Sequence, residues 1–75
     1  MNKTGIQLYD RTWLAEKRTA AGLTQSQAAE AAKVSQGLYS RFEGGVGKPG
    51  VVPGLLLAKA LGFDPDIWLN ERRLA

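Results

Sequence analysis

The stretch LTQSQAAEAAKVSQGLYSRFEG, residues 23–44, carries the clearest structural signals of this chain. Thr24 and Gln27 have the spacing of a capping box, in which each side chain satisfies the other residue's backbone N–H, so a helix is predicted over residues 25–33. A serine, which is a preferred N-cap residue, then precedes a second predicted helix over residues 36–43, and two glycines end it. The stretch therefore predicts two short helices joined by a tight turn.

Small and large side chains are distributed as a close crossing of these two helices requires. Where two helices meet at a steep angle through a short turn, their backbones approach closely, and Ala29 and Ala32 leave room for this. Val34 can fill the turn as an apolar plug, while Tyr39 and Phe42 supply large side chains for the inner face of the second helix. This arrangement leaves the opposite face of the second helix turned toward solvent.

The outward face of the second helix combines residue types that can recognise the edges of DNA bases. It consists of Gln36, Gly37, Ser40 and Arg41. Arginine can bind the O6 and N7 atoms of guanine, and glutamine can pair with adenine. A glycine lets the helix backbone approach closely. The competing interpretation is a solvated surface, which is the usual fate of an isolated charged side chain; the shared face favours base contact.

Phosphate contacts are expected beside these base contacts. Backbone N–H groups at the start of a helix bind phosphate oxygens, which favours the neighbourhoods of Gln25 and Ser35, although Ser35 is first of all a helix cap. Lys33 and Lys48 are further candidates for phosphate contact. The alternative for both lysines is a solvated side chain that contacts nothing.

The composition suits a DNA-binding domain and argues against an enzyme. The chain has 75 residues and a net charge of +3, which is compatible with a phosphate partner without requiring one. A domain of this size has little room for an enclosed cleft. The absence of cysteine and histidine removes disulfides, the usual zinc ligands and the most frequent general base. We therefore expect no enzyme activity, no metal, no cofactor and no small-molecule ligand.

The remainder of the chain predicts an all-α domain behind a short N-terminal arm. The arm spans residues 1–9, and the domain spans residues 10–75. Three further helices are predicted, over residues 10–21, from Val52 or Pro53 to Leu61, and from Asp66 to about Arg72. No apolar run has transmembrane length and no signal peptide is recognisable, so no membrane association is expected and the cytoplasm is the expected location.

Three segments of the chain together resemble a known family. They are LTQSQAA (23–29), VSQ (34–36) and YSRFEG (39–44), and they are similar to the Cro/repressor (lambda repressor-like, Xre-type) helix-turn-helix family. The likeness extends from about Trp13 to Leu69, which is nearly the whole chain. The resemblance implies a compact five-helix DNA-binding domain whose third helix reads the major groove.

The resemblance also implies roles for individual positions. Gln36, Gly37 and Arg41 would face bases, with Ser40 close by. Gln25 would bind a phosphate. Arg18 and Glu43 would form a buried structural ion pair. Two departures from the family pattern stand out. Lys33 occupies a turn position that is usually glycine, so it must either adopt a left-handed backbone or change the turn. Leu38, beside Gly37, replaces a longer polar residue and could contact a thymine methyl group.

These features predict a sequence-specific transcriptional regulator in the bacterial cytoplasm, with the nucleoid. We expect a repressor that binds a palindromic operator in double-stranded DNA as a homodimer, with its two reading helices about 34 Å apart. The alternative is an antitoxin-like module that binds a partner protein as well as DNA. The apolar segment Ile67–Leu74 could bind that partner. Its first three residues, Ile67–Leu69, would suggest a dimer contact if they were exposed, because exposed apolar patches mark interaction sites.

Overall fold

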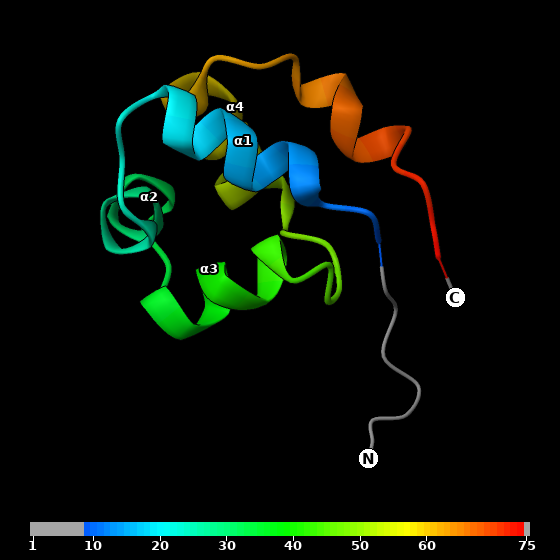
Figure 1. The fold of residues 1–75 in the computed structure, drawn as a ribbon, viewed down its shortest axis with the longest axis horizontal. Helices are drawn as coiled ribbons and strands as arrows, with labels where there is room; N and C mark the ends of the chain where they lie inside the picture. The colour runs from blue at the N-terminus through cyan, green and yellow to red at the C-terminus, as the bar shows by residue number, and fades with distance from the viewer. Residues whose placement is uncertain (1–8, 75) are drawn as a thin grey trace.

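Four α-helices and one 3-10 turn follow one another in the computed structural model, which describes residues 9–74 (Figure 1). The elements are α1 (Thr12–Ala20), α2 (Gln25–Ala32), α3 (Gln36–Glu43), α4 (Val51–Leu61) and the 3-10 turn η1 (Pro65–Leu69). The predicted all-α class is confirmed for this part of the chain. Most of the arm predicted over residues 1–9 lies outside the described residues.

The predicted fifth helix, from Asp66 to about Arg72, is wrong. The chain forms only η1 there, in which the N–H of Ile67 donates to the carbonyl of Asp64 at 3.1 Å, the spacing of a 3-10 helix. The chain beyond η1 does not continue as an α-helix because its backbone pairs with the start of the domain. The carbonyl of Arg72 accepts the N–H of Asp10 at 3.1 Å. Residues 9–74 therefore contain four α-helices rather than five.

The helix starts and ends follow the local signals in the sequence. The capping box is formed, since the N–H of Gln27 donates to Thr24 Oγ1 at 3.1 Å and the N–H of Thr24 donates to Gln27 Oε1 at 2.9 Å. The helix predicted from Asp10 begins slightly later, and the Asp10 carboxylate instead accepts the hydroxyl of Thr12 at 3.0 Å. α4 begins one residue before the predicted range, at Val51.

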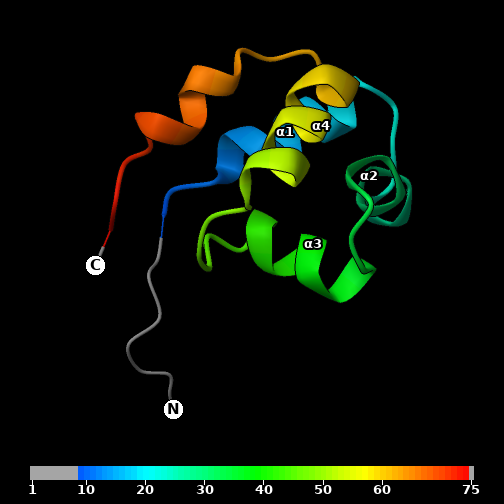
Figure 2. The ribbon, with the colours of Figure 1, turned by 180° about the vertical axis from the view of Figure 1, so that it is seen from behind.

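The core lies between α2, α3 and α4, with α1 packed against it. Tyr39 is fully buried and Phe42 is 4% exposed, so the inner face predicted for α3 is confirmed. Three alanines of α2, Ala28, Ala29 and Ala32, are buried in the same core, and Val34 packs against it from the turn. In Figures 1 and 2, α3 lies along one edge of the molecule while η1 lies at the opposite edge. The outer face of α3 is thus left uncovered by the other elements.

The two ends of the described chain meet beside α3. The N–H of Tyr9 donates to the carbonyl of Gly45 at 2.9 Å, and Tyr9 also forms an isolated antiparallel bridge with Arg73. Gly45 has a φ of +81°, and a Cβ atom there would collide with the Tyr9 carbonyl oxygen. Tyr9, the last residue of the predicted arm, is therefore bound both to the loop after α3 and to Arg73 near the other end of the described chain.

Arg11 forms a buried polar centre at this meeting point. The side chain is fully buried, and its Nη1 donates to the carbonyl of Phe42 at 2.6 Å. Its Nη2 donates to the carbonyl of Gly47 at 2.7 Å and to Glu71 Oε1 at 2.7 Å, while Nε pairs with the other oxygen of Glu71. One guanidinium thus holds together the end of α3, the loop after it and the C-terminal segment.

Candidate nucleic-acid interface

The four predicted base-reading residues share the outer face of α3. Gln36, Gly37, Ser40 and Arg41 are all exposed. On the opposite side of the same helix, Tyr39 and Phe42 are buried in the core. Because buried side chains on one face fix the rotation of a helix, this packing sets the direction in which the polar face points.

The start of α3 is held by a serine cap. The Oγ of Ser35 accepts the N–H of Leu38 at 3.1 Å, and Ser35 itself is exposed. At the other end, the N–H of Gly44 donates to the carbonyl of Ser40 at 3.0 Å, which closes the last turn. Both ends of α3 are therefore fixed by hydrogen bonds, so the exposed face is a pre-organised surface.

Lys33 lies in the turn between α2 and α3 with a left-handed backbone. Its φ is 59° and its ψ is 41°, and its N–H donates to the carbonyl of Glu30 at 3.1 Å. The sequence left open whether a lysine here would be left-handed or would change the turn, and the structure has the left-handed form. Its exposed side chain remains available close to the start of α3.

Replacing Lys33 by glycine is expected to raise the free energy of unfolding by about 0.5–1 kcal/mol. A left-handed residue with a Cβ atom costs about 1–2 kcal/mol, and the greater freedom of glycine in the unfolded chain cancels part of the gain. Lys33→Ala is the matched control, because it removes the same charge but keeps the backbone cost. Thermal unfolding of both variants measures the effect; a glycine variant no more stable than the alanine variant would contradict it.

Glu43, the last residue of α3, joins all three elements that surround the turn. Its carboxylate forms an ion pair with Arg18 of α1 and accepts the side-chain amide of Gln25 at 2.9 Å. The hydroxyl of Tyr39 donates to its Oε2 at 2.7 Å. The side chain of Glu43 is 8% exposed and that of Arg18 is 19% exposed, so the pair is partly buried. This Glu43 cluster ties α1, α2 and α3 together.

The cluster shifts the ionisation of its members. Burial opposes the charged form of Glu43, but the hydrogen bonds from Arg18, Gln25 and Tyr39 outweigh it and hold the pKa of Glu43 below its ordinary value. The hydrogen bond to Glu43 raises the pKa of Arg18 in turn. Burial, followed by the hydrogen bond to the carboxylate, raises the pKa of Tyr39. The cluster therefore favours a charged Glu43–Arg18 pair beside a neutral Tyr39.

Acid is expected to weaken the domain through Glu43. Because the pKa of Glu43 is lower in the folded state than its ordinary 4.5, its contribution is present above pH 4.5 and is lost as the pH falls through the folded-state value. Urea unfolding measured between pH 7 and pH 3 should show a smaller acid dependence for Glu43→Gln than for the natural chain. Glu30→Gln removes an exposed carboxylate and is the control; equal acid dependence in all three chains would contradict the prediction.

Two predicted phosphate contacts are placed differently by the structure. The side-chain amide of Gln25 donates to Glu43 Oε1, so a phosphate contact at this residue would use its backbone N–H in the first turn of α2. The ammonium of Lys48 donates to the carbonyl of Trp68 and lies 5.3 Å from the centre of the Tyr9 ring. The structure thus gives Lys48 a bond to η1, and its phosphate contact stays a prediction.

Some residues that shape this surface were not identified from the sequence. Arg11 and Glu71 are 60 positions apart, so no local pattern connects them. The bond between Tyr39 and Glu43 was also missed, although residues four apart on a helix are neighbours and this spacing could have revealed it. These residues hold α3 in place without lying on its outer face.

Other kinds of site find little support in the described part of the chain. None of the helices there is long and apolar enough to cross a membrane. Within residues 9–74, no cluster of carboxylates is arranged to hold a metal ion.

Comparison with known proteins gives consistent matches. The family model described as Helix-turn-helix matches residues 14–68. The chain is 34% identical over 61 residues to the Uncharacterized HTH-type transcriptional regulator YqaF of Bacillus subtilis (strain 168), covering 81% of this chain and 80% of that protein.

A solved structure matches the fold as well. The restriction-modification controller protein C.AhdI from Aeromonas hydrophila superposes with a TM-score of 0.66 and 32% sequence identity, over 76% of this chain and 86% of that one. The matched region contains α2, the turn and α3, whose geometry is described above. The chain therefore belongs to the helix-turn-helix family, a family of DNA-binding transcriptional regulators and not of enzymes.

Proposed function

We propose that this regulator reads a specific DNA sequence by placing the outer face of α3 in the major groove. The observation that carries the proposal is the orientation of α3: Tyr39 and Phe42 are buried, while the polar side chains opposite them are exposed. Arg41 would bind a guanine and Gln36 an adenine, with Ser40 beside them. Gly37 lies between these side chains and lets the helix backbone approach the base pairs.

Phosphate contacts would fix the register of α3 on the duplex. The exposed ammonium of Lys33 and the hydroxyl of Ser35 lie at the turn that precedes α3. The backbone N–H of Gln25 lies in the first turn of α2, where the helix dipole favours an anion. The net charge of +3 supports approach to a polyanion.

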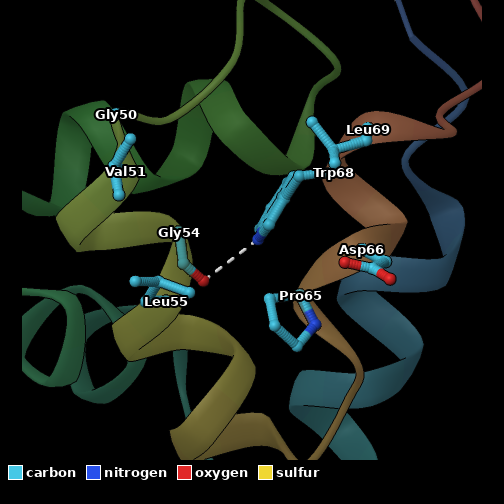
Figure 3. A pocket seen from close by; sticks show the side chains of 8 residues that line it. All are labelled: Gly50, Val51, Gly54, Leu55, Pro65, Asp66, Trp68 and Leu69. Carbon is cyan, nitrogen blue, oxygen red and sulfur yellow. Dashed lines mark hydrogen bonds between the residues drawn. The ribbon is translucent and has the colours of Figure 1, made fainter.

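We also propose that the chain binds a palindromic operator as a homodimer through an apolar surface made by α4 and η1. A groove of about 290 Å³ separates the two elements, as Figure 3 shows, with the indole N–H of Trp68 bound to the Gly54 carbonyl at 3.0 Å. Three large apolar side chains on its rim are exposed: Val51 at 78%, Leu55 at 51% and Leu69 at 80%. Such a patch on a small domain favours self-association, and a two-fold dimer matches a palindrome.

A repressor is the regulatory role that we propose for this dimer. With a DNA-reading helix and a self-association surface, as proposed above for the described residues, occupying a promoter and excluding polymerase is the simplest action available. A reporter gene placed behind the selected operator tests this, because repression should require both an intact α3 face and an intact α4–η1 surface. The two relatives described above come from bacteria, which supports action in the cytoplasm with the nucleoid.

Selection of duplexes from a randomised DNA library tests the DNA-binding proposal directly. We expect a palindromic duplex to be enriched, and its affinity, measured by fluorescence anisotropy, to fall steeply with added salt because bound phosphates release counterions. Failure to enrich any sequence would contradict the proposal, as would an affinity that does not change between low and physiological salt.

Replacing Leu69 by aspartate is expected to dissociate the dimer without unfolding the protomer. The side chain is 80% exposed, so a charge there costs the protomer little but is costly in an apolar interface. Sedimentation analysis of the variant should show the monomer at concentrations where the natural chain is dimeric. Leu74→Asp, which introduces the same charge at an exposed leucine outside α4 and η1, is the control; an unchanged dimer in Leu69→Asp would place the interface elsewhere.

A further inference from the structure

Leu38 is an apolar side chain on a helix whose exposed face is otherwise polar. Large apolar side chains are exposed at several positions of the described chain, but Leu38 is the one carried by α3, and it is 37% exposed. Its backbone is fixed, because its N–H is bound by the cap residue Ser35 at 3.1 Å. Leu38 therefore presents a small apolar surface in a fixed position at the edge of the reading face.

Leu38 and Arg41 are neighbours on the surface of α3. Residues three apart on a helix have Cβ atoms about 5–6 Å from each other. Tyr39 follows Leu38 and Phe42 follows Arg41, and both aromatic side chains are buried in the core. Leu38 and Arg41 therefore lie between the buried face and the exposed face of α3. The apolar side chain of Leu38 and the cationic side chain of Arg41 thus lie side by side on the part of α3 that would contact a duplex.

Gly37, the residue before Leu38, has no evident role in the folded chain. Its φ is not in the left-handed region, and a Cβ atom added to it would have no neighbour within 4 Å. A glycine inside a helix costs about 0.5–1 kcal/mol relative to alanine, and here the fold gains nothing in return. The missing side chain does allow the α3 backbone to approach base pairs closely enough for the short side chain of Leu38 to touch them.

The major groove offers one apolar group, the C5-methyl of a pyrimidine, and guanine offers the paired acceptors that arginine prefers. We infer that Leu38 is a specificity-determining residue, which contacts the C5-methyl of a 5-methylpyrimidine, thymine or 5-methylcytosine, close to the guanine that Arg41 reads. Bases on one strand are about 3.4 Å apart along the axis, so a Cβ separation of about 5–6 Å spans one or two steps. The pyrimidine is thus adjacent to the guanine or one position further. The inference rests on the proposed insertion of α3 into the major groove.

The test uses the full chain and the duplex that it selects from a randomised library. Each thymine is replaced in turn by deoxyuridine, which removes only the methyl group, and each cytosine by 5-methylcytosine, which adds it. The natural chain should lose about four- to tenfold in affinity when one methyl group is removed, or gain as much when one is added, because that group would be buried against Leu38. The responsive pyrimidine should lie within two positions of the base pair whose preference is lost in Arg41→Ala.

Variants of Leu38 assign the effect to this side chain. Leu38→Ala should bind the methylated and unmethylated probes with nearly equal affinity, whereas Leu38→Met should keep most of the difference because it remains apolar. Leu74→Ala, which shortens an exposed leucine of the C-terminal segment, should keep all of it. A selected duplex that is indifferent to every methyl exchange, or a methyl effect unchanged in Leu38→Ala, overturns this inference alone. Enrichment of no duplex overturns the proposed function together with it.

Discussion

Replacement of Glu71 by alanine is expected to lower the free energy of unfolding by about 3–5 kcal/mol, the largest stability effect of a single side chain predicted for this domain. The carboxylate and the Arg11 guanidinium are fully buried side chains that pair through two hydrogen bonds. Without Glu71, the guanidinium remains buried with a full charge and no counter-ion. Small domains are stable by about 5–15 kcal/mol, so this loss would remove a large part of the total.

The surroundings of Arg11 explain why it cannot simply turn to solvent. The guanidinium lies 5.0 Å from the centre of the Tyr9 ring and 5.2 Å from that of Trp68. It also donates to the carbonyl of Phe42, the penultimate residue of α3. Moving the arginine outward would therefore break these contacts with the aromatic rings and leave the Phe42 carbonyl at the end of α3 with only the N–H of Gly45 as a partner.

Urea unfolding monitored by tryptophan fluorescence measures the effect of Glu71→Ala. Glu30→Ala, which removes an exposed carboxylate from α2, should change the stability by less than about 0.5 kcal/mol. The double variant Arg11→Met/Glu71→Leu should recover part of the loss, because it removes both charges and replaces them with apolar volume. A loss below about 1 kcal/mol in Glu71→Ala would show that the pair contributes as little as a surface ion pair.

Arg41→Ala is expected to weaken binding to the selected duplex by about 1–3 kcal/mol and to relax the preference at one base pair. Arg41 is exposed on α3 opposite the buried face, so its removal should leave the fold intact. A bidentate contact to guanine loses two hydrogen bonds at a single position, which explains why the loss should be local in sequence.

Anisotropy titrations against the selected duplex and its single-base variants measure this loss. Arg73→Ala removes an exposed arginine from the C-terminal segment and is the matched control for charge. If Arg41→Ala weakened every duplex equally and reduced the salt dependence, the side chain would bind a phosphate and the assignment of Arg41 to a base would be wrong.

The local parts of the fold were predictable because their signals lie within a few residues. The capping box of Thr24 and Gln27 and the serine cap at Ser35 fixed the starts of α2 and α3, and the bounds of α3 agree with the prediction. The burial of Tyr39 and Phe42 followed from the same spacing, and it determines which side of α3 faces outward.

The parts that were not predicted depend on contacts between distant residues. Glu71 reaches Arg11 across 60 positions, and this contact draws the chain after η1 into an extended path instead of a fifth helix. Lys48 looked like any basic residue in a glycine-rich loop, yet its ammonium binds the Trp68 carbonyl. Neither position carries a local signal, since only the assembled fold brings the partners together.

The bridge between Tyr9 and Arg73 brings the two ends of the described chain together, so this part of the fold forms only after both ends have been synthesised. Domains begin to form while the ribosome is still adding residues. Arg11 precedes Glu71 by 60 positions, so its guanidinium stays without this counter-ion until Glu71 has been synthesised. We therefore expect the Phe42 carbonyl of α3 to acquire its bond from Arg11 only after the segment that carries Glu71 has joined the fold.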